Sequence, residues 1–417
     1  MLRSLFPRVH HKFLSMPLLG LITDGFDDWL VSNGYTCRSR KCSIGRLPEI
    51  DAALRRRRVK EIANLTHSVL HDYWRAVMKI HPTGAGTVRN LGRYLAENSL
   101  MADDRQTATS ATFASILSEE YMNHLRQVRG FAASTVSHHR YTAQCFLQHL
   151  EEARTTLENI HVQQIESYVA KAGKRLSRAS LQHDIGALRG FLRFLAMEGR
   201  IPPGLGVQID TPRHYRLEQL PRALPWKMVR ALLRSLDTTS AMGLRDYTMF
   251  LLIATYGLRS CEVVAITLDD IRWRQGILRI HQRKTLSSLE LPLTNEVSWA
   301  IVKHLKRTPP PAPHRRIFLR MRAPLGVLKP TAITEAFQAL VRKSGLNISF
   351  QGAHCLRHSY AVHLLKNGTP LKTIGDILGH HTAESTAMYL RLATGDLREV
   401  ALEVPDKKRR NAKEGQR

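Results

Sequence analysis

Helical periodicity runs through the first half of the chain, and it constrains the fold more than any other feature of the sequence. Apolar residues recur at intervals of three and four, as they do on the buried face of an amphipathic helix. Four helices are predicted in this region, over residues 113–128, 134–150, 165–172 and 181–197. Ser134 is the expected N-cap of the second helix. We therefore expect a four-helix domain over residues 109–203 and a polar, proline-containing linker over residues 204–220.

The second half of the chain mixes helix and strand patterns. Two short strands, over residues 276–280 and 289–293, flank a polar turn at residues 284–288. Further helices are predicted over residues 247–256, 297–305, 333–343, 355–366, 371–378 and 383–393. The expected fold class is mainly α with a small β-hairpin or sheet in the C-terminal domain (α+β). This domain spans residues 221–405, and residues 406–417 form a charged tail with no apolar face, expected to be disordered.

The charge of the chain indicates what it binds. It has 62 Lys and Arg against 35 Asp and Glu, a net charge of +27, which favours a polyanionic partner such as nucleic acid or an anionic membrane surface. The apolar runs are shorter than the roughly 18 residues of a membrane span. The basic residues are not gathered on one amphipathic helix, which disfavours a membrane surface. The five cysteines are scattered, so we expect no disulfide framework and a reducing, cytoplasmic location.

Four short polar stretches in the second half are candidates for chemistry. They contain Arg259 at the end of an apolar helix, Lys284 in the hairpin turn, His354 with Arg357, and His380 nine residues before Tyr389. Taken singly, each has an ordinary structural explanation: Arg259 can interact with the helix dipole or with nearby Glu262, and Lys284 can be a solvated hairpin lysine. His354 and His358 are also spaced like a zinc-binding pair, but no glutamate follows His354 and no cysteine pair accompanies them, so metal binding is the weaker interpretation.

Taken together, in this order and spacing, the four stretches resemble the signature boxes of the tyrosine recombinase (phage integrase) family. The matching segments read YGLRSCEVVAITLDDI, HCLRHSYAVHLLKNG and LGHHTAESTAMYL. The resemblance covers residues 217–404, and residues 109–203 are similar to the family's core-type DNA-binding domain. It implies six catalytic residues: Arg259, Lys284, His354, Arg357, His380 and Tyr389.

The lysine position departs from the family pattern. The family usually places this lysine in a Gly-Lys-Gly turn, whereas this chain reads Gln282-Arg283-Lys284-Thr285. Counting forward from Arg259 leads to Arg283, and counting back from Pro292 leads to Lys284. We assign Lys284, because an arginine holds its proton too tightly to be a good general acid.

The resemblance implies a reaction that suits these residue types. Tyr389 attacks a phosphodiester and forms a 3′-phosphotyrosyl link, and the two arginines match the charge on the non-bridging oxygens through paired hydrogen bonds. His354 is the candidate base for the tyrosine, and Lys284 the candidate acid for the leaving 5′-hydroxyl. His380 is expected to hydrogen-bond the phosphate. Because the link conserves the bond energy, rejoining needs no ATP, metal or other cofactor.

The implied function is site-specific recombination or integration, as by the integrase of a mobile element. The implied partners are double-stranded DNA, three further copies of the chain in a homo-tetramer, and accessory recombination proteins. The short amphipathic segment over residues 396–404 either packs on its own domain or docks on a neighbouring protomer. A type IB topoisomerase and a catalytically inactive DNA-binding protein are the alternatives. The short catalytic half disfavours the first, and the presence of every motif residue disfavours the second.

The first 108 residues form an additional basic helical domain, with 17 Lys and Arg against 10 Asp and Glu. Residues 26–98 contain a pattern that repeats the four-helix domain at an offset of 95 or 96, and later of 100. The repeated positions are apolar residues or glycines, such as Gly34 and Gly130 or Tyr73 and Tyr168. The sequence therefore predicts a duplicated domain that binds DNA, with a role in protein assembly as the alternative.

Overall fold

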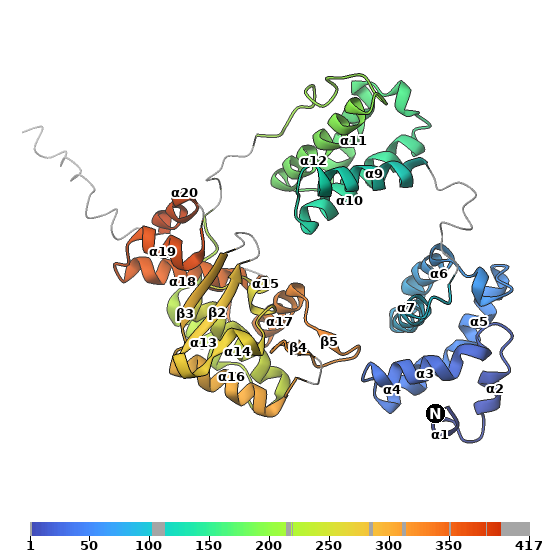
Figure 1. The fold of residues 1–417 in the computed structure, drawn as a ribbon, viewed down its shortest axis with the longest axis horizontal. Coiled ribbons are helices and arrows are strands. Elements are labelled where there is room, and N and C mark those ends of the chain that lie inside the picture. The colour runs from blue at the N-terminus through green and yellow to red at the C-terminus, as the bar shows by residue number, and fades with distance from the viewer. Residues whose placement is uncertain are drawn as a thin grey trace, which may run out of the picture. The chain divides into compact units, whose positions relative to one another are not determined.

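The computed structural model describes residues 2–101, 113–213, 218, 220–282, 287–310, 314–349, 352–380 and 382–392. Helices dominate these residues, and the strands are short and antiparallel (Figure 1). The expected mainly α fold with a small sheet is therefore confirmed. The chain divides into two compact units, one of residues 1–31 and 36–218 and the other of residues 32–35 and 219–417. The segment over residues 396–404 and the tail over residues 406–417 lie outside the described residues.

Residues 2–101 form a first helical bundle. Its helices are α1 (Leu2–Leu5), α2 (His10–Leu14), η1 (Gly20–Ile22), α3 (Thr23–Ser32), α4 (Cys37–Gly45), α5 (Leu47–Arg56), η2 (Ile62–Asn64), α6 (His67–Ile80) and α7 (Pro82–Glu97). The buried carboxylate of Asp51 on α5 accepts hydrogen bonds from the backbone amides of Leu18 and Leu19, at 3.0 and 2.8 Å. It also pairs with Arg55 at 2.9 Å. These bonds tie α5 to the chain that enters η1, and they satisfy a charge that would be unfavourable if buried alone.

Residues 113–213 form a second bundle, and the four predicted helices are confirmed there. Its helices are α9 (Phe113–Gln127), α10 (Ala133–Glu152), η3 (Leu157–Asn159), α11 (Val162–Gly173) and α12 (Arg178–Met197). Asp184 on α12 is buried, and its two oxygens accept hydrogen bonds from Thr142 on α10 at 2.6 Å and Tyr168 on α11 at 3.0 Å. One carboxylate therefore connects three helices inside an otherwise apolar core.

Two details of the second bundle differ from the sequence expectations. The prediction that Ser134 caps this helix is wrong. Helix α10 begins at Ala133, and Ala132 holds the N-cap position without a side-chain hydrogen bond. The start of the expected linker is packed, since Leu205 and Ile209 are buried in the core of the bundle. Arg189 on α12 holds this segment by donating a 2.6 Å hydrogen bond to the carbonyl of Ile209.

The C-terminal unit is built around α14 (Ala241–Tyr256). This helix is apolar on nearly every side, so it is stable only when other elements surround it. Helices α13, α16, α17 and α18 all pack on it. The helices of the unit other than α14 are α13 (Trp226–Arg234), α15 (Ser260–Val263), η4 (Leu268–Asp270), η5 (Trp273–Gln275), α16 (Asn295–Arg307), α17 (Pro330–Ser344), α18 (His354–Lys366), α19 (Leu371–Leu378), α20 (Ala383–Ala387) and η6 (Met388–Leu392).

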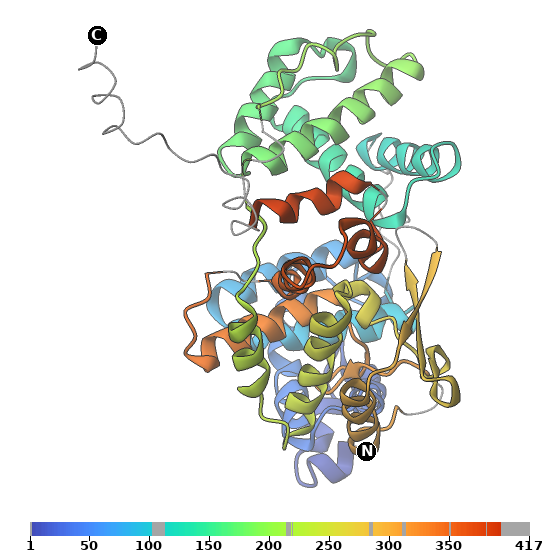
Figure 2. The same cartoon turned by 90° about the vertical axis from the view of Figure 1, so that its left-hand side faces the viewer.

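A small sheet lies beside these helices. Strands β1 (Ile271–Arg272), β2 (Ile277–Gln282) and β3 (Ser287–Pro292) form an antiparallel sheet in sequence order, and β4 (Leu319–Arg320) pairs with β5 (Gly326–Val327). Ile280 faces Leu289 across the β2–β3 hairpin. Figure 2 shows this hairpin at one side of the helices of the same unit. The turn that contains Arg283 and Lys284 lies outside the described residues.

The end of the described chain packs as a second, smaller core. Ala361 of α18, Ile374 and Leu378 of α19, and Tyr389 of η6 are buried against one another. This packing brings the last motif of the sequence against the helix that carries the third motif. It therefore positions the candidate nucleophile beside the candidate phosphate ligands.

Candidate active site

Arg259 is positioned by the turn that follows α14. Gly257 ends that helix with a φ of 65°, a conformation that glycine adopts at little cost. A Cβ on Gly257 would also lie only 2.5 Å from the side chain of Leu378, so a glycine lets the ends of α14 and α19 approach closely. Arg259 then holds the N-cap position of α15, and its guanidinium donates to Glu262 at 2.8 Å and to the carbonyl of Gly379 at 3.2 Å.

Arg357 lies on α18 and is only 2% exposed. Its guanidinium donates to the carbonyls of Gly257 and Leu378, the second at 2.6 Å. Burial and the nearby charge of Arg259 lower the pKa of Arg357 to about 10, so it keeps its charge at neutral pH. Both arginines thus donate to the turn at residues 378–379, and Arg357 also donates to the turn at residue 257. Two guanidiniums in one small region make a strong site for an anion.

Three histidines surround this region. His354 begins α18 and is exposed, and its ring packs edge-on against that of His358 at 4.6 Å. His380 follows the C-terminal end of α19, and its Nδ1 is 2.9 Å from the hydroxyl of Thr386. Burial and the charges of Arg357 and Arg259 lower the pKa of His380 to about 4. His380 is therefore a neutral imidazole at pH 7, able to donate one hydrogen bond and accept another.

Tyr389 is buried, with 1% of its surface exposed. Its hydroxyl is 3.0 Å from Nδ1 of His358. Burial raises the pKa of Tyr389, and the charges of Arg357 and Arg259 act in the opposite direction. Burial and the neighbouring cations lower the pKa of His358 to about 4, so its ring is neutral at pH 7 and can accept a hydrogen bond from the tyrosine hydroxyl. The structure thus pairs the tyrosine with His358, whereas the sequence had suggested His354 as its base.

The structure gathers five of the six predicted residues into one site: Arg259, His354, Arg357, His380 and Tyr389. The sixth, Lys284, and its alternative Arg283 lie outside the described residues. The hairpin that carries them does reach the site, because a Cβ on Gly379 would lie 2.3 Å from the amide of Gln282 at the end of β2.

Sequence reasoning missed one supporting residue, His358, and named another, Glu262, only as a structural partner of Arg259. His358 was considered only as half of a metal-binding pair, although its position one residue after Arg357 places it on the same helix as the site. Glu262 is buried and accepts two hydrogen bonds from Arg259, from its backbone amide and from its guanidinium, at 2.8 Å each. The sequence had offered this pairing as the ordinary structural explanation of Arg259, and the structure confirms it.

No cluster of three or more His, Cys, Asp or Glu suited to a metal ion occurs within the part of the chain that the structure describes. Among the same residues, none of the helices is both long enough and apolar enough to span a membrane.

Comparison with family models gives two matches, each over a different part of the chain. Residues 222–395 match the model of the phage integrase family, and residues 118–199 match the N-terminal SAM-like domain of phage integrases. The first match contains all six predicted site residues, and the second covers most of the second bundle.

Two curated proteins extend the similarity. "Putative integrase/recombinase y4rF" of Sinorhizobium fredii is 31% identical over 296 residues, which cover 70% of this chain and 69% of that protein. The tyrosine recombinase XerD of Listeria monocytogenes is 26% identical over 292 residues, which cover 68% of this chain and 96% of that protein.

Solved structures share the fold. A lambda integrase dimer bound to a core site matches with a TM-score of 0.52 and 18% identity, over 66% of this chain and 94% of that one. The XerH site-specific recombinase bound to its difH substrate matches with a TM-score of 0.52 and 17% identity, over 70% of this chain and 86% of that one. With the matches of both family models and the relative above 30% identity, these findings show that the chain belongs to the phage integrase family of tyrosine recombinases.

Proposed function

We propose that this chain is a site-specific DNA recombinase that breaks and rejoins DNA strands through a covalent tyrosine intermediate. The observation that carries the proposal is the convergence of Arg259 and Arg357 on the turn at residues 378–379, beside Tyr389. Two fixed cations and one candidate nucleophile are the groups needed for a phosphoryl transfer without a metal.

In the cleavage step, the Tyr389 oxygen attacks the scissile phosphorus, and the bond from phosphorus to the 5′-oxygen of the next nucleotide breaks. The two guanidiniums stabilise the negative charge that gathers on the non-bridging oxygens. His380 donates a hydrogen bond to the same phosphate. The product is a 3′-phosphotyrosine and a strand with a free 5′-hydroxyl, and attack by a 5′-hydroxyl from a second DNA strand reverses the chemistry.

The proton balance assigns the remaining groups. Tyr389 must lose a proton, and His358 is the neutral acceptor in hydrogen-bond contact with it, while His354 lies beside His358. The leaving 5′-oxygen must gain a proton, and we assign its donor to Lys284 on the hairpin that reaches the site. Positive charge around the site supports the tyrosinate as it forms.

The partner is double-stranded DNA, bound by several copies of the chain. The related lambda integrase occurs as a tetramer bound to a Holliday junction in a structure with a TM-score of 0.53 to this chain. An enzyme that exchanges two duplexes needs four cleavage events, which a homo-tetramer supplies with one tyrosine per protomer. We infer that the protein acts in the cytoplasm, in association with the nucleoid.

A nicked duplex that carries candidate sites from the DNA flanking the gene tests this proposal. Cleavage near the nick releases a short strand and traps the protein on DNA, so we expect a covalent adduct that survives denaturation and EDTA. A topoisomerase would form the adduct and relax supercoiled DNA without exchanging partners. Good binding without any adduct would contradict the enzyme and favour a DNA-binding protein.

A further inference from the structure

The first bundle repeats the second element by element. Helix α3, then α4 with α5, then η2, α6 and α7 follow the order of α9, α10, η3, α11 and α12. Unusual backbone angles recur at the same places, with positive φ at Gly34 and Gly130 (77° and 62°), at Arg58 and Arg154 (64° and 53°), and at Ser99 and Gly199 (54° and 67°). Positive φ is uncommon for arginine and serine, so its presence at both Arg58 and Arg154, and at Ser99 opposite Gly199, favours a common backbone plan.

Hydrogen bonds and buried positions repeat in the same way. At the ends of α7 and α12, Leu100 donates to the carbonyl of Leu95 and Arg200 to that of Leu195, both at 2.9 Å. Matching positions of the two cores are buried: Leu54 and Leu150, Leu65 and Ile160, Leu70 and Ile165, and Tyr73 and Tyr168. The main difference is a break at Arg46, which divides the counterpart of α10 into α4 and α5.

The two bundles differ sharply in charge at one corner. In the first bundle, residues 55–60 at the end of α5 read Arg-Arg-Arg-Arg-Val-Lys, and in the second, residues 151–156 at the end of α10 read Glu-Glu-Ala-Arg-Thr-Thr. This corner, residues 55–60, is called here the basic corner. Its five cations are exposed. They replace a corner with two carboxylates and one arginine.

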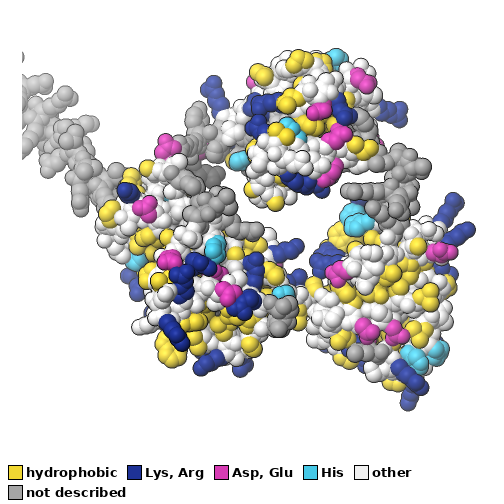
Figure 3. Space-filling model, viewed as in Figure 1, with side chains coloured by type: hydrophobic (Ala, Val, Ile, Leu, Met, Phe, Trp, Pro, Cys, Tyr) yellow, Lys and Arg dark blue, Asp and Glu magenta, His cyan; other side chains and the backbone are white. Residues whose placement is uncertain are grey.

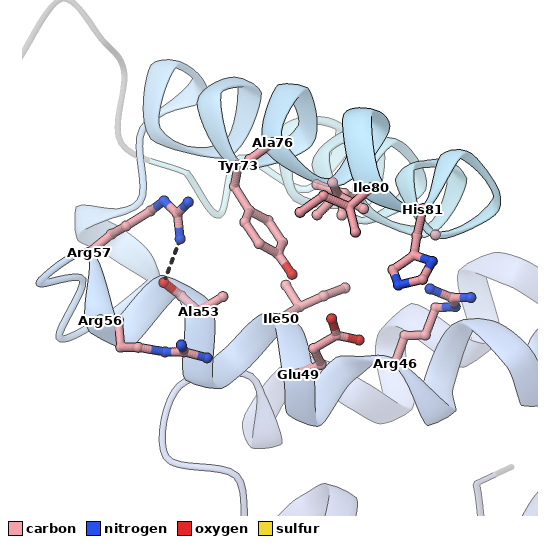
Figure 4. A pocket seen from close by; sticks show the side chains of 13 residues that line it. Arg46, Glu49, Ile50, Ala53, Arg56, Arg57, Tyr73, Ala76, Ile80 and His81 are labelled. Carbon is pink, nitrogen blue, oxygen red and sulfur yellow. Dashed lines mark hydrogen bonds between the residues drawn. The ribbon is translucent and has the colours of Figure 1, made fainter.

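The hollow beside the basic corner is also more positively charged than its counterpart in the second bundle. In the second bundle, a hollow of about 330 Å³ has Arg175 on its lining and is crossed by an ion pair between Lys171 and Glu152, 2.6 Å apart. The matching hollow of the first bundle, about 390 Å³, has Arg56 in place of Glu152 and Ala76 in place of Lys171 (Figure 4). Arg46 adds a further guanidinium to its lining.

The hollow of the first bundle also contains one acid and an apolar floor. Glu49 lies on its lining with Ile50, and Tyr73 points into it from α6 (Figure 4). The carboxylate of Glu49 offsets one charge, so three arginines on the lining, Arg46, Arg56 and Arg57, leave an excess of cations.

Local structure explains only part of the basic corner. Arg55 pairs with buried Asp51, and Arg57 donates to the carbonyl of Ala53 at 3.0 Å with its guanidinium over the ring of Tyr73. Basic residues in a last helical turn also stabilise the helix. Arg58 and Lys60 lie beyond the end of α5, however, and Arg46 precedes its start, so the dipole of this helix does not account for them.

We propose that residues 23–101 are a second copy of the helical bundle, altered at the basic corner and its hollow so that it binds the phosphate backbone of double-stranded DNA outside the site of cleavage. Figure 3 shows Lys and Arg side chains in many places on the chain. The basic corner differs from the rest because the second bundle carries acidic residues at the matching positions. An exposed row of cations, held in part by the contacts of Arg55 and Arg57, matches the regular row of phosphate charges on a DNA strand. The proposal does not depend on the catalytic assignments.

The test compares two triple variants of the full-length chain, each made with Tyr389→Phe so that covalent chemistry does not interfere. The first variant carries Arg56→Gln, Arg58→Gln and Lys60→Gln, and it leaves the supporting contacts of Arg55 and Arg57 intact. The control carries Arg3→Gln, Arg8→Gln and Lys12→Gln, which removes three exposed cations from α1, α2 and their connection. Thermal unfolding confirms that both variants fold.

Binding is measured on a mixed-sequence duplex of about 60 base pairs, roughly six helical turns, over a range of salt concentrations. Each lost phosphate contact reduces the slope of log affinity against log salt by about 0.9, so the corner variant should lose up to about 3 in slope. Its affinity at about 0.15 M salt should fall tenfold or more. The control should keep nearly the full slope. An unchanged slope in the corner variant, or equal losses in both variants, would overturn the proposal; the first result would favour an acidic protein as the partner.

Discussion

The two sides of the active site are held in different ways. Arg259 and Arg357 are anchored to main-chain carbonyls at the ends of α14 and α19. Tyr389, by contrast, lies in the last described turn, where its hydroxyl contacts one histidine side chain. Main-chain anchors position the cations before any substrate arrives, which is the arrangement that electrostatic stabilisation of a transition state requires. The tyrosine side depends on side-chain contacts and apolar packing, so single substitutions can alter it without disturbing the two arginines.

The largest expected effect is on the tyrosine side. Tyr389→Phe removes only the hydroxyl, so DNA binding should stay within about twofold while covalent adduct falls below detection, because no nucleophile is left. Denaturing gels of the nicked-duplex reaction measure the adduct. Tyr360→Phe is the matched control, because Tyr360 packs on the same small core. Adduct at the normal level in Tyr389→Phe would rule out this nucleophile.

The next effect concerns the proton donor on the hairpin. Lys284→Ala should slow cleavage by about 10²- to 10⁴-fold, as expected for loss of a general acid. A substrate with sulfur at the 5′-bridging position needs no protonation of its leaving group, so it should restore the rate of Lys284→Ala but not that of Arg259→Ala. Rescue of Arg283→Ala instead would move the assignment by one residue.

On the arginine side, Arg259→Lys and Arg357→Lys should each slow cleavage by about 10²- to 10³-fold, since a lysine keeps the charge but cannot make the paired hydrogen bonds. Single-turnover rates with saturating protein measure the effect. Arg245→Lys is the control, because Arg245 is also buried and also donates to a main-chain carbonyl, that of Leu319. If both site variants cleave at the normal rate, the arginines do not bind the scissile phosphate.

The sequence was sufficient for the elements whose formation depends on local pattern. The helix predicted over residues 297–305 is present as α16, and the hydroxyl of Thr294 caps it by accepting a hydrogen bond from the amide of Val297. The segment after residue 203 could not be predicted in this way, because its packing depends on Arg189, which is distant in sequence.

The site shows the same division between local and distant information. The motifs identified Arg259, Arg357 and Tyr389 by their order. The sequence does not identify the hydrogen-bond partner of Tyr389. His354 and His358 lie one turn apart on α18, and only the position of η6 decides between them. The role of that partner therefore needs its own test.

The smallest expected effect tests whether His358 supports the tyrosine. His358→Gln keeps a hydrogen-bond acceptor near the hydroxyl but removes a titrating group, so we expect cleavage to slow by about tenfold. It should also change the dependence of stability on pH. The pKa of His358 is about 4 in the folded chain and near 6.5 in an unfolded one. Between these values the unfolded chain binds a proton that the folded chain does not, so the free energy of unfolding falls as the pH falls from 6.5 towards 4.

Between about pH 7 and pH 4.5, the free energy of unfolding should therefore fall by about 2 kcal/mol less in His358→Gln than in the unaltered chain. Urea denaturation at the two pH values measures this difference. His314→Gln, at an exposed position of the same unit, is the control for the loss of a histidine. Equal acid sensitivity in His358→Gln and the unaltered chain would mean that this imidazole is not held neutral beside Tyr389. The base for the tyrosine would then have to be sought at His354, the exposed histidine one turn earlier on α18.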